Sequence, residues 1–157
     1  MNEKTTEHAV FTIERTYAAS PQQVFNAWAD PAAKAAWFVA PDEYASSGHR
    51  LDFKVGGREH LTSKMTDGPI YTYDALYRDI VENRRIVYAY DMYRDEARIS
   101  VSLATVEIMP ADSGTRLIYT EQGAFLDGGD KPEYREQGTR DLLDKLEAAL
   151  KKATATA

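Results

Sequence analysis

The sequence predicts an α+β fold in which a curved antiparallel sheet of six or seven strands wraps around a long C-terminal helix. Segments rich in β-branched and aromatic residues follow one another with hairpin-length joins, a pattern typical of antiparallel sheets. Two short helical segments interrupt the strands after the first one. From Pro132 onward apolar residues recur at helical spacing, and only this helix is large enough to cover one face of the sheet.

Length and composition limit the possible classes of protein. With 157 residues we expect one domain over 1–157, with its core at about 9–151. The absence of cysteine excludes disulfides, thiolate nucleophiles and cysteine zinc sites. A net charge of -6 without a segregated basic patch argues against nucleic acid as a partner. No apolar run resembles a signal peptide or a membrane span, so we expect a cytoplasmic protein without membrane insertion. We also expect a monomer or a weak homodimer.

The N-terminal part predicts one strand and two short helices. Residues 9–17 (AVFTIERTY) form a strand that carries Arg15 in its otherwise apolar row. Ser20–Pro21 and Asp30–Pro31 each place a capping side chain before a proline, which marks the start of a helix. The second helix carries Trp37.

The middle of the chain predicts six further strands. After a loop at 40–48, residues 49–55 alternate apolar Leu51, Phe53 and Val55 with polar residues, and Gly56–Gly57 predicts a turn. The remaining strands are expected at 58–65, 70–80, 86–92, 98–109 and 115–122.

The C-terminal part predicts a loop and then the long helix. The glycine-rich segment 123–131 (GAFLDGGDK) is expected to be a loop, in which Phe125 either forms the apolar tip of a lid or plugs the end of the core. In the helix, Thr139, Leu142 and Leu146 share one face.

Several stretches, taken in order, resemble a known family. They are ERTYAASPQQVFNAWADPAAKAAWF at 14–38, YRDIVENRRIVYAY at 77–90, SGTRLIYTEQGAFLDG at 113–128 and REQGTRDLLDKLEAAL at 135–150. Together they resemble the Aha1-like (activator of Hsp90 ATPase homologue-like) branch of the START/Bet v 1-like SRPBCC superfamily. The resemblance implies a helix-grip fold. The family often has tryptophan where this chain has Thr139, a difference expected to widen the cavity or alter its floor.

Tyrosine is concentrated in one part of the chain. Six of the ten tyrosines lie within residues 71–93. Tyr71, Tyr73 and Tyr77 share one face of their strand, and Tyr88 and Tyr90 share one face of the next. One interpretation is that these tyrosines belong to the core or to an aromatic ladder on the solvent side. A second is that they line a ligand cavity, and a third is that one of them is a catalytic acid.

A cavity between the sheet and the C-terminal helix would be lined from both sides. The residues expected to hold a ligand are Trp37, Phe53, Tyr73, Tyr77, Tyr88, Tyr90, Leu103, Tyr119, Glu121, Phe125, Leu142 and Leu146.

Arg15 and Glu121 are the expected polar anchor, because the first and last strands are neighbours in the resembled fold. Glu107 is the substitute partner for Arg15, since an unpaired buried guanidinium is very costly. The alternatives are a structural ion pair or two unrelated surface charges.

Recognisable catalytic and metal-binding motifs are missing. His8, His49 and His60 lack metal-ligand spacing and are expected at the surface, although His49 and His60 flank one hairpin. We find no nucleophile elbow, phosphate loop or dinucleotide fingerprint, and therefore expect neither a metal nor a cofactor.

Three functions follow as hypotheses. The first is binding of a small hydrophobic or aromatic molecule. The second is an enzyme of the polyketide cyclase/aromatase or hydrolase type that acts on such a molecule. The third, implied only by the resemblance, is an Hsp90-type chaperone-interaction module. We expect it less, because the Hsp90 activator carries an additional domain that this chain lacks.

Overall fold

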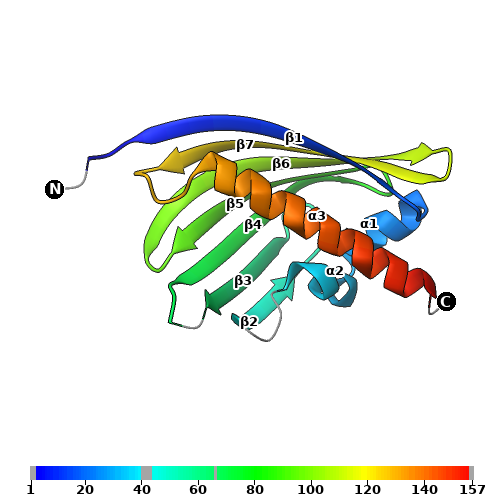
Figure 1. The fold of residues 1–157 in the computed structure, drawn as a ribbon, viewed down its shortest axis with the longest axis horizontal. Coiled ribbons are helices and arrows are strands. Elements are labelled where there is room, and N and C mark those ends of the chain that lie inside the picture. The colour runs from blue at the N-terminus through cyan, green and yellow to red at the C-terminus, as the bar shows by residue number, and fades with distance from the viewer. Residues whose placement is uncertain (1–2, 40–43, 66, 156–157) are drawn as a thin grey trace.

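The computed structural model describes residues 3–39, 44–65 and 67–155. The elements follow the order strand, two helices, six strands, helix (Figure 1). Their bounds are β1 Thr6–Tyr17, α1 Pro21–Ala29, α2 Pro31–Phe38, β2 Tyr44–Leu51, β3 Arg58–Met65, β4 Ile70–Val81, β5 Arg85–Arg94, β6 Ala97–Ala111, β7 Gly114–Leu126 and α3 Pro132–Ala155.

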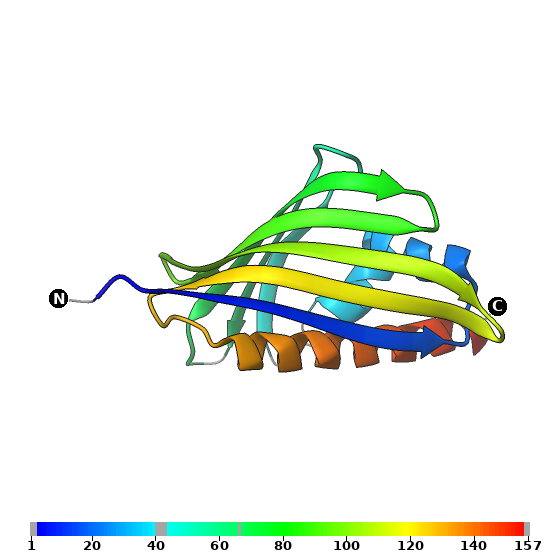
Figure 2. The same cartoon turned by 90° about the horizontal axis from the view of Figure 1, so that it is seen from above.

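The strands form one antiparallel sheet of seven strands in the order β1-β7-β6-β5-β4-β3-β2. Consecutive strands pair as hairpins except at β1, which pairs with β7 and places Phe11 opposite Glu121. The sheet curves around α3, and α1 and α2 lie beside the C-terminal half of that helix (Figures 1 and 2). The predicted helix-grip α+β fold is confirmed.

Local signals explain where the helices begin. Ser20 accepts a hydrogen bond from the Gln23 amide, and the Gln23 side chain accepts one from the Ser20 amide, which makes a complete capping box. Asp30 caps α2 in the same way by accepting from the Ala33 amide. Both helices were predicted from these residues.

The largest differences from the predicted strand boundaries are at β2 and β7, while β1 begins at Thr6, three residues before its predicted start. Residues 44–51 form β2, whereas 52–57 leave the sheet, because the Gly56 amide donates to the Tyr77 carbonyl and folds this connection onto β4. Segment 123–126 is the end of β7 rather than a loop. It pairs with β1 on one side and β6 on the other, and these two ladders outweigh the weak strand propensity of glycine.

The concave face of the sheet and the apolar face of α3 form the core. Burial alternates along β1, where Phe11, Ile13 and Tyr17 are buried between exposed neighbours. Leu143 and Leu146 of α3 are almost fully buried against this face. Within the described segments, no helix combines the length and the apolar character needed to cross a membrane.

Candidate functional site

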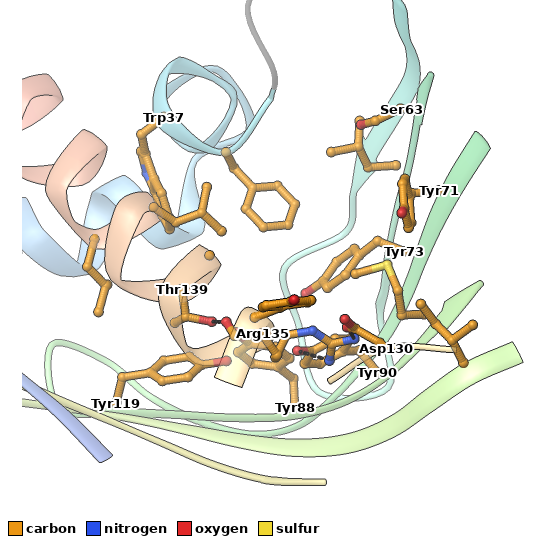
Figure 3. Close-up of a pocket in the computed structure, with 18 of the residues that line it drawn as sticks. Trp37, Ser63, Tyr71, Tyr73, Tyr88, Tyr90, Tyr119, Asp130, Arg135 and Thr139 are labelled. Carbon is orange, nitrogen blue, oxygen red and sulfur yellow. Dashed lines mark hydrogen bonds and ion pairs between the residues drawn. The ribbon is translucent and has the colours of Figure 1, made fainter. Parts of the chain in front are cut away.

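A cavity of about 460 Å³ lies between the concave face of the sheet and the N-terminal half of α3 (Figure 3). Side chains from both short helices, from the sheet and from α3 line it. These are Trp28, Trp37, Phe38, Leu61, Ser63, Tyr71, Tyr73, Tyr88, Tyr90, Met92, Ile99, Tyr119, Asp130, Tyr134, Arg135, Gly138, Thr139, Leu142 and Leu143. The interior between sheet and helix is therefore not completely filled by the chain's own side chains.

Aromatic rings make up much of the wall. Tyr73 of β4 and Tyr90 of β5 have ring centroids 5.0 Å apart, and Tyr88 packs beside Tyr90 at 6.0 Å. Phe38 of α2 meets Tyr73 edge-on at 5.0 Å, so the helices continue the aromatic surface of the sheet. Such rings give a ligand large apolar contact with few rotamers to fix.

Glu121 of β7 is the centre of a buried polar network. The side chain is 1% exposed and accepts hydrogen bonds from the hydroxyls of Tyr90 at 2.8 Å, Tyr119 at 2.6 Å and Ser102 at 2.9 Å. Its cationic partner is Arg135 of α3, with Nη1 3.3 Å from Oε2. Because all of these donors converge on one carboxylate, its burial is compensated.

Arg135 extends this network to the cavity wall. Its Nη2 donates to Ser100 Oγ at 2.7 Å and to Asp130 Oδ2 at 2.9 Å, as Figure 3 shows for Asp130. The guanidinium also lies over the rings of Tyr90 and Phe125, 5.5 and 5.1 Å from their centroids. Burial opposes the charge, but Tyr90, Glu121 and Asp130 raise the pKa of Arg135 above its ordinary value.

Two donors in the wall have no partner in the described part of the chain. The Tyr73 hydroxyl and the Trp28 Nε1 are buried and make no hydrogen bond. Both residues line the cavity, and Figure 3 shows the Tyr73 ring extending from β4 into it. A buried polar group without a partner is unfavourable, so a bound molecule whose acceptor reached either atom would gain a hydrogen bond that the protein alone does not make.

A second buried cluster supports the helical end of the wall. Lys34 of α2 is 0% exposed, and its Nζ lies 2.9 Å from Oε1 of Glu59 of β3. The same ammonium lies over the ring of Phe38, 4.3 Å from the centroid, and over both tryptophans. Glu59 also accepts from Tyr77 and interacts with His49, each at 2.9 Å.

The ionisation of this cluster follows from its contacts. Burial alone would raise the pKa of Glu59, but Lys34 and the hydrogen bonds from His49 and Tyr77 lower it to about 2. Burial raises the pKa of Tyr73, Tyr88 and Tyr119 well above the ordinary value. These phenols stay protonated at neutral pH, so they act as hydrogen-bond donors and not as bases.

The predicted ligand-binding residues divide into two groups. Those that line the cavity are Trp37, Tyr73, Tyr88, Tyr90, Tyr119 and Leu142. The other predicted residues lie elsewhere, for reasons that follow from the strand boundaries and the polar network.

The residues outside the cavity wall are mostly core. Phe53 lies in the connection that leaves the sheet and packs against Phe25 and Tyr77. Tyr77 is buried, with its hydroxyl on Glu59. Phe125 packs beneath the Arg135 guanidinium, so it closes the core and is not the tip of a lid. Leu146 is buried further along α3.

Leu103 was predicted to face the cavity, and this is wrong. It is 39% exposed on the convex face, because its neighbours Ser102 and Ala104 occupy the buried row of β6. Glu107 lies in the same exposed row and is no partner for Arg15.

The predicted Arg15–Glu121 pair is also wrong. In the β1–β7 register Arg15 lies opposite Leu117, whereas Glu121 lies opposite Phe11. Arg15 reaches toward α3 instead, where Nη2 is 3.5 Å from Asp144. The helix, not the neighbouring strand, supplies the cation for Glu121.

His8 is exposed as predicted, whereas His49 and His60, which flank one hairpin and could have met across strands, have other partners. His49 and His60 do not pair with each other: His49 contacts Glu59, and His60 lies 2.6 Å from Asp74. The His49 side chain is only 13% exposed. Among the described residues, no group of three His, Asp or Glu side chains is arranged to hold a metal ion.

Lys34, Glu59 and Arg135 were not predicted as site residues from the sequence. Helical spacing contained a signal for two of them. Lys34 is three residues before Trp37, and Arg135 is four before Thr139, so each shares a face with residues expected inside.

Comparison with known proteins gives one family and many similar structures. Residues 18–151 match the model of a family described as activator of Hsp90 ATPase homolog 1-like protein. A comparison with curated proteins gave no match.

Two solved structures are similar in both sequence and fold. An uncharacterised protein from Rhizobium leguminosarum is 44% identical, with 96% of this chain and 99% of that chain covered and a TM-score of 0.91. A protein from Rhizobium loti is 46% identical, with 92% and 99% covered and a TM-score of 0.86. An AHSA1-like protein from Aeromonas hydrophila, at 20% identity, 93% and 94% coverage and a TM-score of 0.68, shows the same fold.

Proposed function

Because the chain belongs to the family of activator of Hsp90 ATPase homolog 1-like proteins, which has a START/Bet v 1-like fold, we propose that it binds a small hydrophobic or aromatic molecule between the sheet and α3. The observation that carries the proposal is the cavity of about 460 Å³. Ligand sites of proteins have volumes of roughly 300–1,000 Å³.

The lining supports this proposal. Rings from β4, β5 and β7 and from α1 and α2 supply apolar contact, and the polar groups are few and held in place. This combination is typical of small-molecule sites, in which a few fixed polar groups orient an apolar ligand.

The chemistry of the wall favours binding over turnover. General acid–base catalysis needs a group whose pKa lies near the working pH. Burial raises the pKa of Tyr73, Tyr88 and Tyr119 further above that pH. Glu121 is occupied by four donor residues and is not free to abstract a proton from a substrate.

A thermal-shift screen against hydrophobic metabolites tests the proposal. A ligand at about a hundredfold excess over Kd stabilises the folded state by about 2.7 kcal/mol. Recovery of the hit unchanged after incubation supports a binding protein, whereas conversion of the hit identifies an enzyme. If no compound stabilises the protein while Hsp90 is captured in a pull-down, a chaperone-interaction role replaces ligand binding.

A further inference from the structure

We infer that the cavity selects uncharged ligands that carry a hydrogen-bond acceptor for Tyr73 or Trp28, and that it discriminates against carboxylates. This inference rests on the proposed function and specifies the class of ligand. It follows from the charges at the wall and from the two donors without partners.

The cation at the cavity wall is already occupied. Among the described lining residues, Arg135 and Asp130 are the ones that carry a formal charge. Both N–H bonds of Arg135 Nη1 have acceptors, in Tyr90 Oη at 2.9 Å and Glu121 Oε2 at 3.3 Å. Both N–H bonds of Nη2 also have acceptors, in Ser100 and Asp130.

Two aromatic rings lie against the guanidinium as well. Those of Tyr90 and Phe125 have centroids 5.5 and 5.1 Å from it, so a ligand carboxylate that approached Nη1 or Nη2 would have to displace a protein group. A bidentate Arg–carboxylate contact, the usual way to bind an organic acid, is therefore not available.

The balance of charge at this end is negative. One guanidinium faces two carboxylates, those of Glu121 and Asp130, which leaves a formal charge of one negative unit. The other buried cation, Lys34, is paired with Glu59 and does not line the cavity. A ligand carboxylate would lose its hydration without gaining a free cation, which is strongly unfavourable.

The two donors without partners indicate that a ligand carries a hydrogen-bond acceptor. The indole N–H of Trp28 can only donate, and the Tyr73 hydroxyl has a proton to donate. Tyr73 is 7% exposed and Trp28 is 3% exposed, so bulk water does not satisfy these atoms. A carbonyl, ether or other neutral acceptor on a flat apolar body would give one of these donors a partner, while the body contacts the aromatic rings.

Three matched probes separate these features. Isothermal titration of the full chain would compare 2-acetylnaphthalene, naphthalene and 2-naphthoate at neutral pH. The acetyl compound offers an uncharged acceptor, naphthalene offers none, and the naphthoate carries a charge on the same ring system. We expect the acetyl compound to bind most tightly and the naphthoate at least about tenfold more weakly.

Two variants connect these affinities to the residues. Tyr73→Phe should reduce the advantage of 2-acetylnaphthalene over naphthalene, with naphthalene in the same variant as the matched control. Asp130→Asn removes one negative charge and weakens the interaction with Arg135. The Kd of 2-naphthoate should therefore come closer to that of 2-acetylnaphthalene in this variant.

The outcomes distinguish the inference from the proposed function. If naphthalene and 2-acetylnaphthalene bind but 2-naphthoate binds equally well or better, the inference is wrong and the proposed function stands. If Tyr73→Phe binds 2-acetylnaphthalene as tightly as wild type does, the assignment of the Tyr73 hydroxyl as a donor to the ligand is also wrong. If none of the three probes binds, the inference fails, and the thermal-shift screen against hydrophobic metabolites decides the proposed function separately.

Discussion

Lys34 Nζ lies 2.9 Å from Glu59 Oε1, and the two side chains are 1% and 0% exposed. This ion pair links α2 to β3. It also supports the aromatic wall of the cavity, because the same ammonium lies over the rings of Trp37 and Phe38. The shape of that wall therefore depends on a charge pair that does not itself touch the cavity.

Removing one partner of this pair should be strongly destabilising. We expect Lys34→Met to lower the free energy of unfolding by about 3–5 kcal/mol, since it leaves the Glu59 carboxylate buried without its cation. Urea unfolding measures this change. Lys54→Met is the matched control, because Lys54 pairs with Asp52 at the surface and should change stability by less than about 1 kcal/mol. Equal effects of the two substitutions would contradict the structural importance of the pair.

Stability should also fall at acid pH through Glu59. Its pKa is lowered in the folded state from the ordinary 4.5 to about 2, so the unfolded chain takes up a proton first. The stabilisation is fully present above about pH 4.5 and is lost as the pH falls toward about 2. The difference in unfolding free energy between wild type and Glu59→Gln should therefore shrink when urea titrations move from neutral pH to about pH 3. A difference that stays constant would exclude this carboxylate as the source.

Tyr73→Phe should stabilise the ligand-free protein. The substitution removes a buried hydroxyl that has no partner, and such a group costs about 1–3 kcal/mol. Tyr119→Phe is the matched control, since its hydroxyl donates to Glu121 at 2.6 Å and its loss should destabilise the protein. Thermal unfolding of both variants gives the comparison, and destabilisation by Tyr73→Phe would show that its hydroxyl has a partner in solution.

Arg135 should contribute to folding as well as to the cavity wall. Arg135→Met leaves the Glu121 carboxylate buried without its cation, and we expect a loss of about 3–5 kcal/mol in unfolding free energy. Arg140→Met, which breaks a partly exposed pair with Glu136 one turn along the same helix, should cost less than about 0.5 kcal/mol. If the two variants unfold at the same urea concentration, the network around Glu121 does not stabilise the fold.

The fold could be predicted because its signals are local. The caps at Ser20 and Asp30, the period-two rows and the helical stripe of α3 each depend on neighbouring residues. The boundaries of β2 and β7 could not be predicted, because they are determined by pairing with strands that are distant in the sequence. Gly123 lies inside a strand only because Ala9 and Ser102 pair on either side of it.

The aromatic part of the site was predictable for the same reason. Tyr73 and Tyr90 lie in the buried rows that period two assigns to them. Leu103 shows the limit of this reasoning, since β6 has a small buried row of Ser102 and Ala104 and an apolar residue on the outside. Apolar character alone does not identify the inner face.

The polar part of the site depended on contacts between distant residues. Lys34 and Glu59 are separated by 25 positions, and Arg135 and Glu121 by 14 positions across a turn. Helical spacing places Lys34 and Arg135 on the same helix faces as residues expected inside, but it does not identify the carboxylate that pairs with each of them. That carboxylate is known only from the folded chain.

Substitution of Thr139 by tryptophan tests whether a ligand occupies the space between the sheet and α3. Thr139 is buried in the cavity wall, where Figure 3 draws it among the lining residues, so an indole at this position fills part of the space. Gln137→Trp places the same side chain on the exposed face of α3 as the control. Circular dichroism first establishes that both variants are folded.

Isothermal titration with 2-acetylnaphthalene is then the decisive measurement. We predict that folded Thr139→Trp binds at least about tenfold more weakly than wild type, whereas Gln137→Trp binds with unchanged affinity. Wild-type affinity in folded Thr139→Trp would contradict the account, because the ligand would then bind outside this cavity.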